Sequence, residues 1–193
     1  DNIPAQNILD LITRHENGMP TVESVLLTWD ETVDRTTITQ DPQQNLYGAF
    51  YGVIGRIANP IIANVDQATG SKTKAAQIKA EAYVLRAFFH YLAVNFYARA
   101  YNPATAAGDG GVPYMLEDFP INGLAEKRTV QEVYQFILED LESALELDAL
   151  PENPAGMRVG KAFAYAVKAK VLMAMRDYAG ADQAAIASLA IND

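Results

Sequence analysis

The chain contains few residues of the kinds that carry out catalysis or bind metals. Its two histidines, His15 and His90, lie in separate predicted helices, and no His-x-x-x-His or Glu-x-x-His spacing supplies a second ligand. The sequence has no cysteine, which excludes thiolate metal sites, disulfides and a cysteine nucleophile. No Gly-x-Ser-x-Gly segment positions a serine nucleophile. We therefore expect no catalytic residue, no metal and no cofactor.

The glycine-rich and acidic segments are also better explained as a turn and as surface charges than as a phosphate-binding or catalytic site. The segment Gly108–Gly111 is not followed by Lys-Ser/Thr, so it is typical of a turn rather than a phosphate-binding loop. The acid pairs Glu117-Asp118 and Glu139-Asp140 are neighbours in sequence, and adjacent helical residues point about 100° apart. This spacing favours solvated or ion-paired acids. A glycosidase needs two carboxylates about 5–10 Å apart, and sequence alone leaves that possibility open.

Aromatic residues are the better candidates for ligand contact. Trp29, the only tryptophan, lies in a Thr- and Asp-rich stretch ahead of Tyr47. Its flat ring suits the apolar face of a sugar, and it suits equally the anchoring of a loop. We expect the following residues to contact a ligand: Trp29, Asn45, Tyr47, Tyr101 and Tyr114.

An aromatic segment, AEAYVLRAFFHYLAVNFYARAYN at residues 80–102, contains no glycine or proline and predicts a long helix. Wound at 100° per residue, it has one apolar stripe that we expect to be core. The stripe consists of Ala82, Leu85, Phe89, Leu92, Ala93 and Phe96. A second face carries the polar side chains Tyr83, Arg86, His90, Tyr97 and Tyr101.

That second face contains a charge in an otherwise apolar helix. A buried Arg86 needs a partner, because an unpaired buried charge is strongly destabilising. The expected partner is Asp140 or Glu139 on the next helix. We assign structural or partner contacts, rather than catalysis, to Tyr83, Arg86, His90, Tyr97 and Asp140.

The segments that position these residues are predicted to be helical. Half of the 193 residues are apolar, and no alternating stretch is long enough for a sheet, so the expected class is all-α. We expect a single α-helical domain over 1–193. Its parts are an N-terminal helix and loop over 1–45, long helices over 46–101, a loop over 102–128 and paired helices over 129–193.

Local signals refine this outline. Pro60 is expected to kink the helix that contains it, and Thr129 with Glu132 predicts a capping box at the start of the next long helix. The segments ALELDALP and MRDYAGADQAAIASL resemble tetratricopeptide helix-turn-helix units, whose pairs stack into a superhelix. The predicted fold is therefore a tetratricopeptide-like superhelix of helical pairs with long loop excursions.

Composition narrows the classes of partner. Acidic residues outnumber basic ones by 24 to 15, the formal net charge is −9, and the basic residues form no cluster. A nucleic-acid partner is therefore not expected. Apolar runs are interrupted before the roughly 20 residues that a membrane-spanning helix needs.

Four segments occur in a characteristic order: KAEAYVLRAFFHYLAVNFYA, GGVPY, RTVQEVYQFILEDLESALELDALP and GMRVGKAFAYAVKAKVLMAMRDYAGA. Together they resemble the N-terminal half of the SusD/RagB family of bacterial nutrient-binding proteins. The earlier stretch LYGAFYGVIGRIANPIIANVD, with Asn59 in its Ala-Asn setting, is similar to the family's helix ahead of the repeats. The resemblance covers about residues 46–190 well and the first 45 residues loosely.

This resemblance implies a non-catalytic, surface-exposed outer-membrane lipoprotein of Bacteroidetes-type bacteria. Such a protein captures a glycan or another nutrient and passes it to a SusC-like TonB-dependent transporter. The resemblance also implies a helical scaffold that faces the transporter and a ligand site built largely from loops. Many of those loops belong to a C-terminal half expected to be missing here, as is the lipid anchor that attaches the protein to the membrane.

The alternative is an autonomous tetratricopeptide adaptor that binds a peptide or protein partner in its concave groove. Adaptors of that kind have short turns between repeats. The long excursion over 102–128 favours the nutrient-binding interpretation.

Overall fold

The computed structural model describes residues 5–18, 21–29, 32, 42–117 and 125–192. These residues belong to two compact units, Asp1–Ala49 and Phe50–Asp193, and the boundary falls inside helix α3 (Pro42–Val53). The single domain expected over 1–193 stays a prediction.

The first unit contains helix α1 (Ala5–Glu16) and helix α2 (Val22–Thr28), which pack against each other. A capping box between Thr21 and Ser24 begins α2. Ser24 also holds His15, whose Nδ1 lies 3.2 Å from its Oγ. Trp29 ends α2 in the left-handed conformation, with φ 54°, and its side chain is 87% exposed.

The helix that contains Pro60 is widened instead of simply kinked. After α3, the chain continues through the π-helix η2 (Ile54–Ala58) into α4 (Asn59–Asn64) and the 3-10 turn η3 (Val65–Gln67). The N–H of Asn59 bonds to the carbonyl of Ile54, five residues back. Proline has no N–H to donate, and a wide turn just ahead of it accommodates the missing bond.

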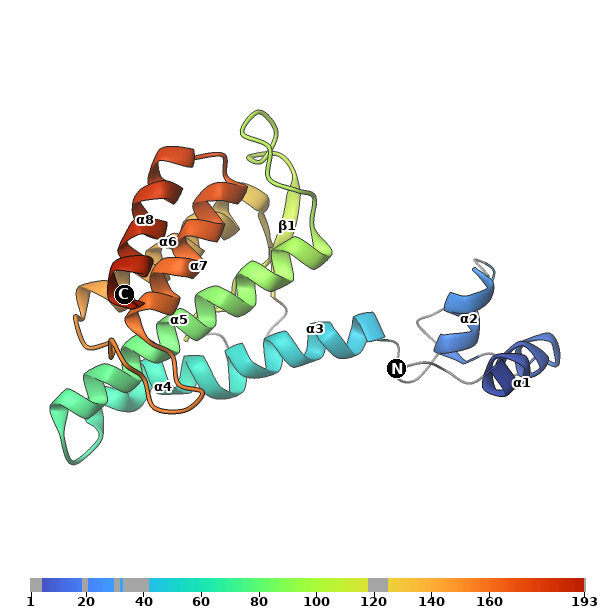
Figure 1. Ribbon diagram of the computed structural model, residues 1–193, viewed down its shortest axis with the longest axis horizontal. Coiled ribbons are helices and arrows are strands. Elements are labelled where there is room, and N and C mark those ends of the chain that lie inside the picture. Colours follow the sequence, from blue (N-terminus) through green and yellow to red (C-terminus); the bar gives the residue numbers. More distant parts are fainter. Residues whose placement is uncertain (1–4, 19–20, 30–31, 33–41, 118–124, 193) are drawn as a thin grey trace. The chain divides into compact units, whose positions relative to one another are not determined.

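Two helical pairs form the body of the second unit (Figure 1). Helix α5 (Lys72–Tyr97) packs against α6 (Val130–Glu146), and α7 (Lys161–Ala174) packs against α8 (Tyr178–Asn192). Contacts between α6 and α7 join the pairs. The predicted all-α, tetratricopeptide-like arrangement of helical pairs is confirmed.

A short antiparallel ladder, absent from the sequence-based prediction, joins the inner part of the expected loop over 102–128 to its C-terminal end. Strand β1 (Gly110–Pro113) pairs with β2 (Lys127–Thr129), with Gly110 opposite Thr129. Strands of four and three residues are too short to give an alternating pattern, so the predicted loop over 102–128 lacks these two strands.

The start of α6 is held by its own capping box and by backbone hydrogen bonds to the turn before β1. The predicted capping box is confirmed, since Thr129 accepts the N–H of Glu132 and the Glu132 carboxylate accepts the N–H of Thr129. The carbonyls of Asp109 and Ala106 accept the N–H groups of Val130 and Gln131. The turn before β1 therefore satisfies the first donors of α6.

The buried faces of α5 differ from those expected. Phe96, assigned to the core stripe, is 63% exposed, whereas Arg86 and His90 are 2% and 0% exposed. The polar face of α5 is buried because it lies against α6, β1 and the π-helix. Ala82 and Ala93 of the predicted stripe are buried as expected.

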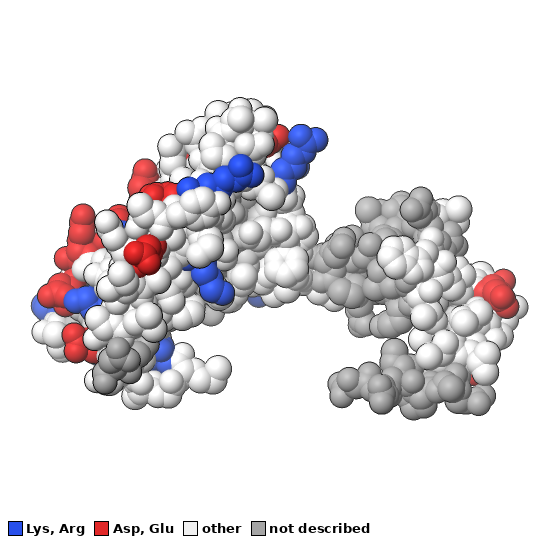
Figure 2. All heavy atoms as spheres, turned by 45° about the horizontal axis from the view of Figure 1, so that its top comes forward, with Lys and Arg blue, Asp and Glu red and all other residues white. Residues whose placement is uncertain are grey.

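Surface charge is mixed. On the face drawn in Figure 2, acidic and basic side chains of the described residues are interspersed instead of gathered into a basic patch. Among the described residues, no helix has the length and apolar character required to cross a membrane.

Candidate functional site

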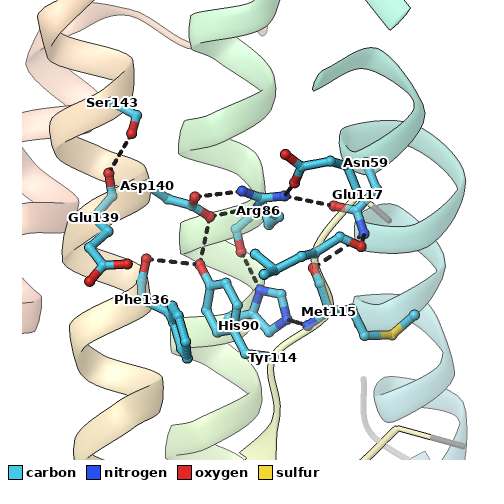
Figure 3. A network of polar contacts seen from close by, with 11 residues as sticks. Asn59, Arg86, His90, Tyr114, Met115, Glu117, Phe136, Glu139, Asp140 and Ser143 are labelled. Carbon is cyan, nitrogen blue, oxygen red and sulfur yellow. Dashed lines mark hydrogen bonds and ion pairs between the residues drawn. The ribbon is translucent and has the colours of Figure 1, made fainter. Parts of the chain in front are cut away.

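A connected network of polar side chains in the second unit centres on Arg86, in the middle of α5 (Figure 3). Its Nε and Nη2 donate to the Oδ2 and Oδ1 atoms of Asp140, each at 2.7 Å. Both side chains are buried, so two parallel charge-assisted bonds replace the water that each has lost. This is one of the two pairings that the sequence predicts for Arg86.

Two further residues bind the remaining nitrogen of Arg86. Its Nη1 donates to Glu117 Oε2 at 2.6 Å and to Asn59 Oδ1 at 3.1 Å. The Asn59 side-chain amide in turn donates to the carbonyls of Met115 and Leu116, at 3.2 and 2.8 Å. Arg86 thus connects α4, α5, α6 and the segment that follows β1.

His90 lies one helical turn beyond Arg86, and both of its nitrogens are engaged. Its Nδ1 lies 2.9 Å from the Arg86 carbonyl, and its Nε2 accepts the N–H of Met115 at 3.1 Å. These bonds require the neutral ring with the proton on Nδ1. Burial lowers the pKa of His90 to about 3, so the ring stays neutral near pH 7. With both nitrogens bonded, His90 cannot ligate a metal.

Tyr114 completes the network. Its ring stacks on His90 at a centroid distance of 3.8 Å, and its hydroxyl donates to Asp140 Oδ2 at 2.6 Å. Burial and the neighbouring Asp140 raise the pKa of Tyr114 well above its usual value. The sequence suggests Tyr114 as a ligand contact, but its side chain is 7% exposed and offers a ligand no open face. Its observed role is structural.

The charges of the network stabilise each other. Burial opposes the charge of Arg86, yet the bonds to Asp140 and Glu117 raise the pKa of the guanidinium. Burial raises the pKa of Asp140, while the guanidinium opposes that rise and holds the two groups as an ion pair. Across the described residues, every buried side-chain nitrogen or oxygen has a hydrogen-bond partner. Such a saturated arrangement fixes the backbone after β1 and leaves no free acid, base or nucleophile inside it.

The other polar candidates of α5 lie at the edge of this network or beyond it. Tyr83 is half-buried, with the Arg86 guanidinium 5.4 Å from its ring centroid. Tyr97 is the last residue of α5, and Tyr101 lies past the helix with its ring 5.0 Å from that of Tyr134. The structure does not bring Tyr97 and Tyr101 to the Arg86 network.

The remaining predicted contacts lie in the first unit. Trp29 and Asn45 are exposed and Tyr47 is half-buried. A ligand role for these three residues stays a prediction, as it does for Tyr101.

Pockets open between the described helices of the second unit. A mainly apolar cavity of about 530 Å³ lies between α5 and α7, with Phe88, Phe163 and Met157 in its lining. A groove between α5 and α6 consists of two adjoining pockets of about 360 and 350 Å³, both lined by Tyr83 and Ser143. Among the described residues, no group of three or more His, Cys, Asp or Glu side chains is placed to hold a metal.

Asn59 and Glu117 belong to the network but are not among the site residues predicted from the sequence. An asparagine before a proline within an apolar helix is a usable signal, since its amide must find partners when buried. Glu117 gives no such signal, because its contact depends on where the segment after β1 lies.

The chain matches a known protein family. A family model named SusD-like, described as "Starch-binding associating with outer membrane", matches residues 6–173. No curated protein matches the chain.

Several solved structures share the fold. A putative sugar-binding protein from Bacteroides vulgatus has TM-score 0.67 and 22% identity, with 76% of this chain and 32% of that chain covered. A laminarin-binding SusD-like protein has TM-score 0.55 and 22% identity, covering 75% and 28%. Surface glycan-binding protein A from Bacteroides uniformis has TM-score 0.57 and 23% identity, covering 72% and 29%. The chain therefore spans about a third of the length of these relatives.

Proposed function

The chain belongs to the SusD-like family, and we propose that it is part of a non-catalytic binding protein that captures a glycan at the cell surface. The observation that carries this proposal is the family match over residues 6–173, which extends from α1 into α7. The sugar-, laminarin- and glycan-binding descriptions of structurally similar proteins support a carbohydrate as the nutrient.

Binding without catalysis agrees with the chemistry of the second unit. The buried acids and bases of the Arg86 network bond to one another, so their role is to hold four segments together. The open groove between α5 and α6 carries carboxylates, a hydroxyl and an aromatic ring, which are groups suited to bind hydroxyls. A nutrient could thus be held by hydrogen bonds and ring contact and released unchanged.

The proposed partner is a SusC-like TonB-dependent transporter in the outer membrane. In this proposal the protein lies at the cell surface, attached to the outer membrane by a lipid anchor. The paired helices α5 to α8 supply a rigid scaffold that faces the transporter, and the glycan passes from the binding protein to the transporter.

Co-purification from native membranes tests the partner. We expect the affinity-tagged full-length protein, solubilised from outer membranes in mild detergent, to recover a large β-barrel receptor. A tag on an unrelated surface lipoprotein provides the control. Recovery of a cytosolic protein in place of the receptor would favour the autonomous adaptor and overturn the transporter proposal.

A further inference from the structure

The segment that follows β1, residues 114–117, is attached to its surroundings through side chains (Figure 3). It forms neither helix nor strand. Each hydrogen bond that the structure shows between this segment and helices α4, α5 and α6 uses a side chain of the helix or of the segment. The helix side chains involved are Asn59, Arg86, His90 and Asp140. The segment can therefore detach while the backbone hydrogen bonds of the helices stay intact.

Three of these attachments weaken when a proton binds. His90 Nε2 accepts the N–H of Met115, which only an unprotonated nitrogen can do. The Glu117 carboxylate pairs with Arg86, and a proton on that carboxylate would neutralise the ion pair. The Asp140 carboxylate binds both the segment and the guanidinium, so it depends on its charge in the same way. Acid therefore acts on all three attachments in one direction.

The ionisable groups around His90 supply no free anion to a protonated ring. Those on α3, on the segment and on α6 are two phenols and two carboxylates, namely Tyr51, Tyr114, Glu117 and Asp140. Phenols carry no charge in acid, and both carboxylates already pair with Arg86. Arg86 itself, one turn away on α5, repels a second positive charge. A proton on His90 thus adds a charge without a partner to a buried site.

We propose that residues 114–117 form an acid-released clasp, which detaches from α5 when His90 is protonated while the helical pairs stay folded. Leu116 and Glu117 form part of the wall of the pocket of about 360 Å³ between α5 and α6. Release of the clasp therefore opens this pocket and admits water to the Arg86 network. The inference goes beyond the proposed glycan-binding function and does not depend on it.

The pH range of release follows from the linkage between detachment and proton binding. Burial lowers the pKa of His90 to about 3 in the attached state, and the ring regains its usual pKa of about 6.5 once it is exposed. Between these two values only the detached state binds the proton. The detached fraction should therefore rise by up to about tenfold for each pH unit below about 6.5.

Hydrogen–deuterium exchange of the full-length protein between pH 5 and pH 7 tests the clasp. Peptide-resolved mass spectrometry, corrected for the intrinsic exchange rate at each pH, gives the protection of the clasp and of α7. We expect the protection of the clasp to fall by up to about tenfold per pH unit below about 6.5, and α7 to stay better protected at every pH. His90→Gln should abolish this pH dependence, because its amide oxygen can accept the Met115 N–H and does not titrate. His15→Gln, in the first unit, is the matched control and should retain it.

Glu117→Gln is a second variant, which keeps the inference testable if His90→Gln is unstable. It removes the ion pair with Arg86 and leaves His90 in place, so we expect lower protection of the clasp with the wild-type pH dependence. Corrected protection of the wild-type clasp that does not change with pH would overturn the inference, and so would a His90→Gln variant that keeps the wild-type dependence. Equal loss of protection in the clasp and in α7 would also overturn it, since that pattern indicates global unfolding.

Discussion

The Arg86 guanidinium and the Asp140 carboxylate face each other through two bonds of 2.7 Å, in the interior between α5 and α6. Each group would be costly to bury alone, and together they join the two helices of the first pair. Asn59 and Glu117 extend the connection to α4 and to the segment after β1. The ion pair thus links α4, α5, α6 and the segment after β1 within the scaffold.

Removal of the guanidinium should destabilise the protein severely. Arg86→Ala leaves the Asp140 carboxylate buried without its cation, and we expect a loss of about 3–5 kcal/mol in the free energy of unfolding. Urea denaturation measures the loss. Arg99→Ala is the control, since Arg99 pairs with Asp109 on the surface with 83% of its side chain exposed, and we expect a change below about 1 kcal/mol. A melting curve unchanged by Arg86→Ala would refute the structural role.

His90 should make stability depend on pH. Its pKa is about 3 in the fold and about 6.5 in an unfolded chain, so between these values only the unfolded state binds the proton. Stability contributed by the neutral ring is therefore complete above pH 6.5 and falls by up to about 1.4 kcal/mol per pH unit as the pH decreases toward 3.

Urea titrations between pH 5 and 7 measure this slope, in a window where few carboxylates titrate. His90→Gln should reduce it, and His15→Gln, in the other unit, provides the control. Equal slopes in the wild type and His90→Gln would contradict a neutral, buried His90.

Gly111 should not tolerate a side chain. A Cβ there would lie 2.9 Å from the Arg128 carbonyl oxygen and 3.0 Å from Thr129 C and Val130 N, all of them backbone atoms. We expect Gly111→Ala to force β1 away from β2 and cost about 1–3 kcal/mol in thermal unfolding. The neighbouring Gly110→Ala is the control, since nothing lies within 4 Å of its Cβ position. Equal stability of the two variants would show that β1 lies farther from β2 than these distances require.

Sequence information predicts the parts of the fold that depend on local patterns. The capping box at Thr129, the helical pairs and the need of Arg86 for an acidic partner all follow from spacing within one or two helices. A charge in an apolar helix is informative because it must be compensated. This makes Arg86 and Asp140 predictable as a pair.

Features that depend on the path of the chain between helices are not predictable in this way. The β1–β2 ladder joins segments too short to show a period, and its two strands are well separated along a long excursion. Tyr114 looks like a loop aromatic in the sequence, and only the ladder places it against His90 and Asp140. The exposure of Phe96 follows from which face of α5 the neighbours cover.

Equilibrium binding of neutral oligosaccharides to the full-length protein, with chromatography of the recovered sugar, tests the central claim most directly. A non-catalytic glycan-binding protein predicts saturable binding of at least one oligosaccharide and its recovery at unchanged length. Absence of binding across a broad panel, or recovery of shortened oligosaccharides, would contradict the account.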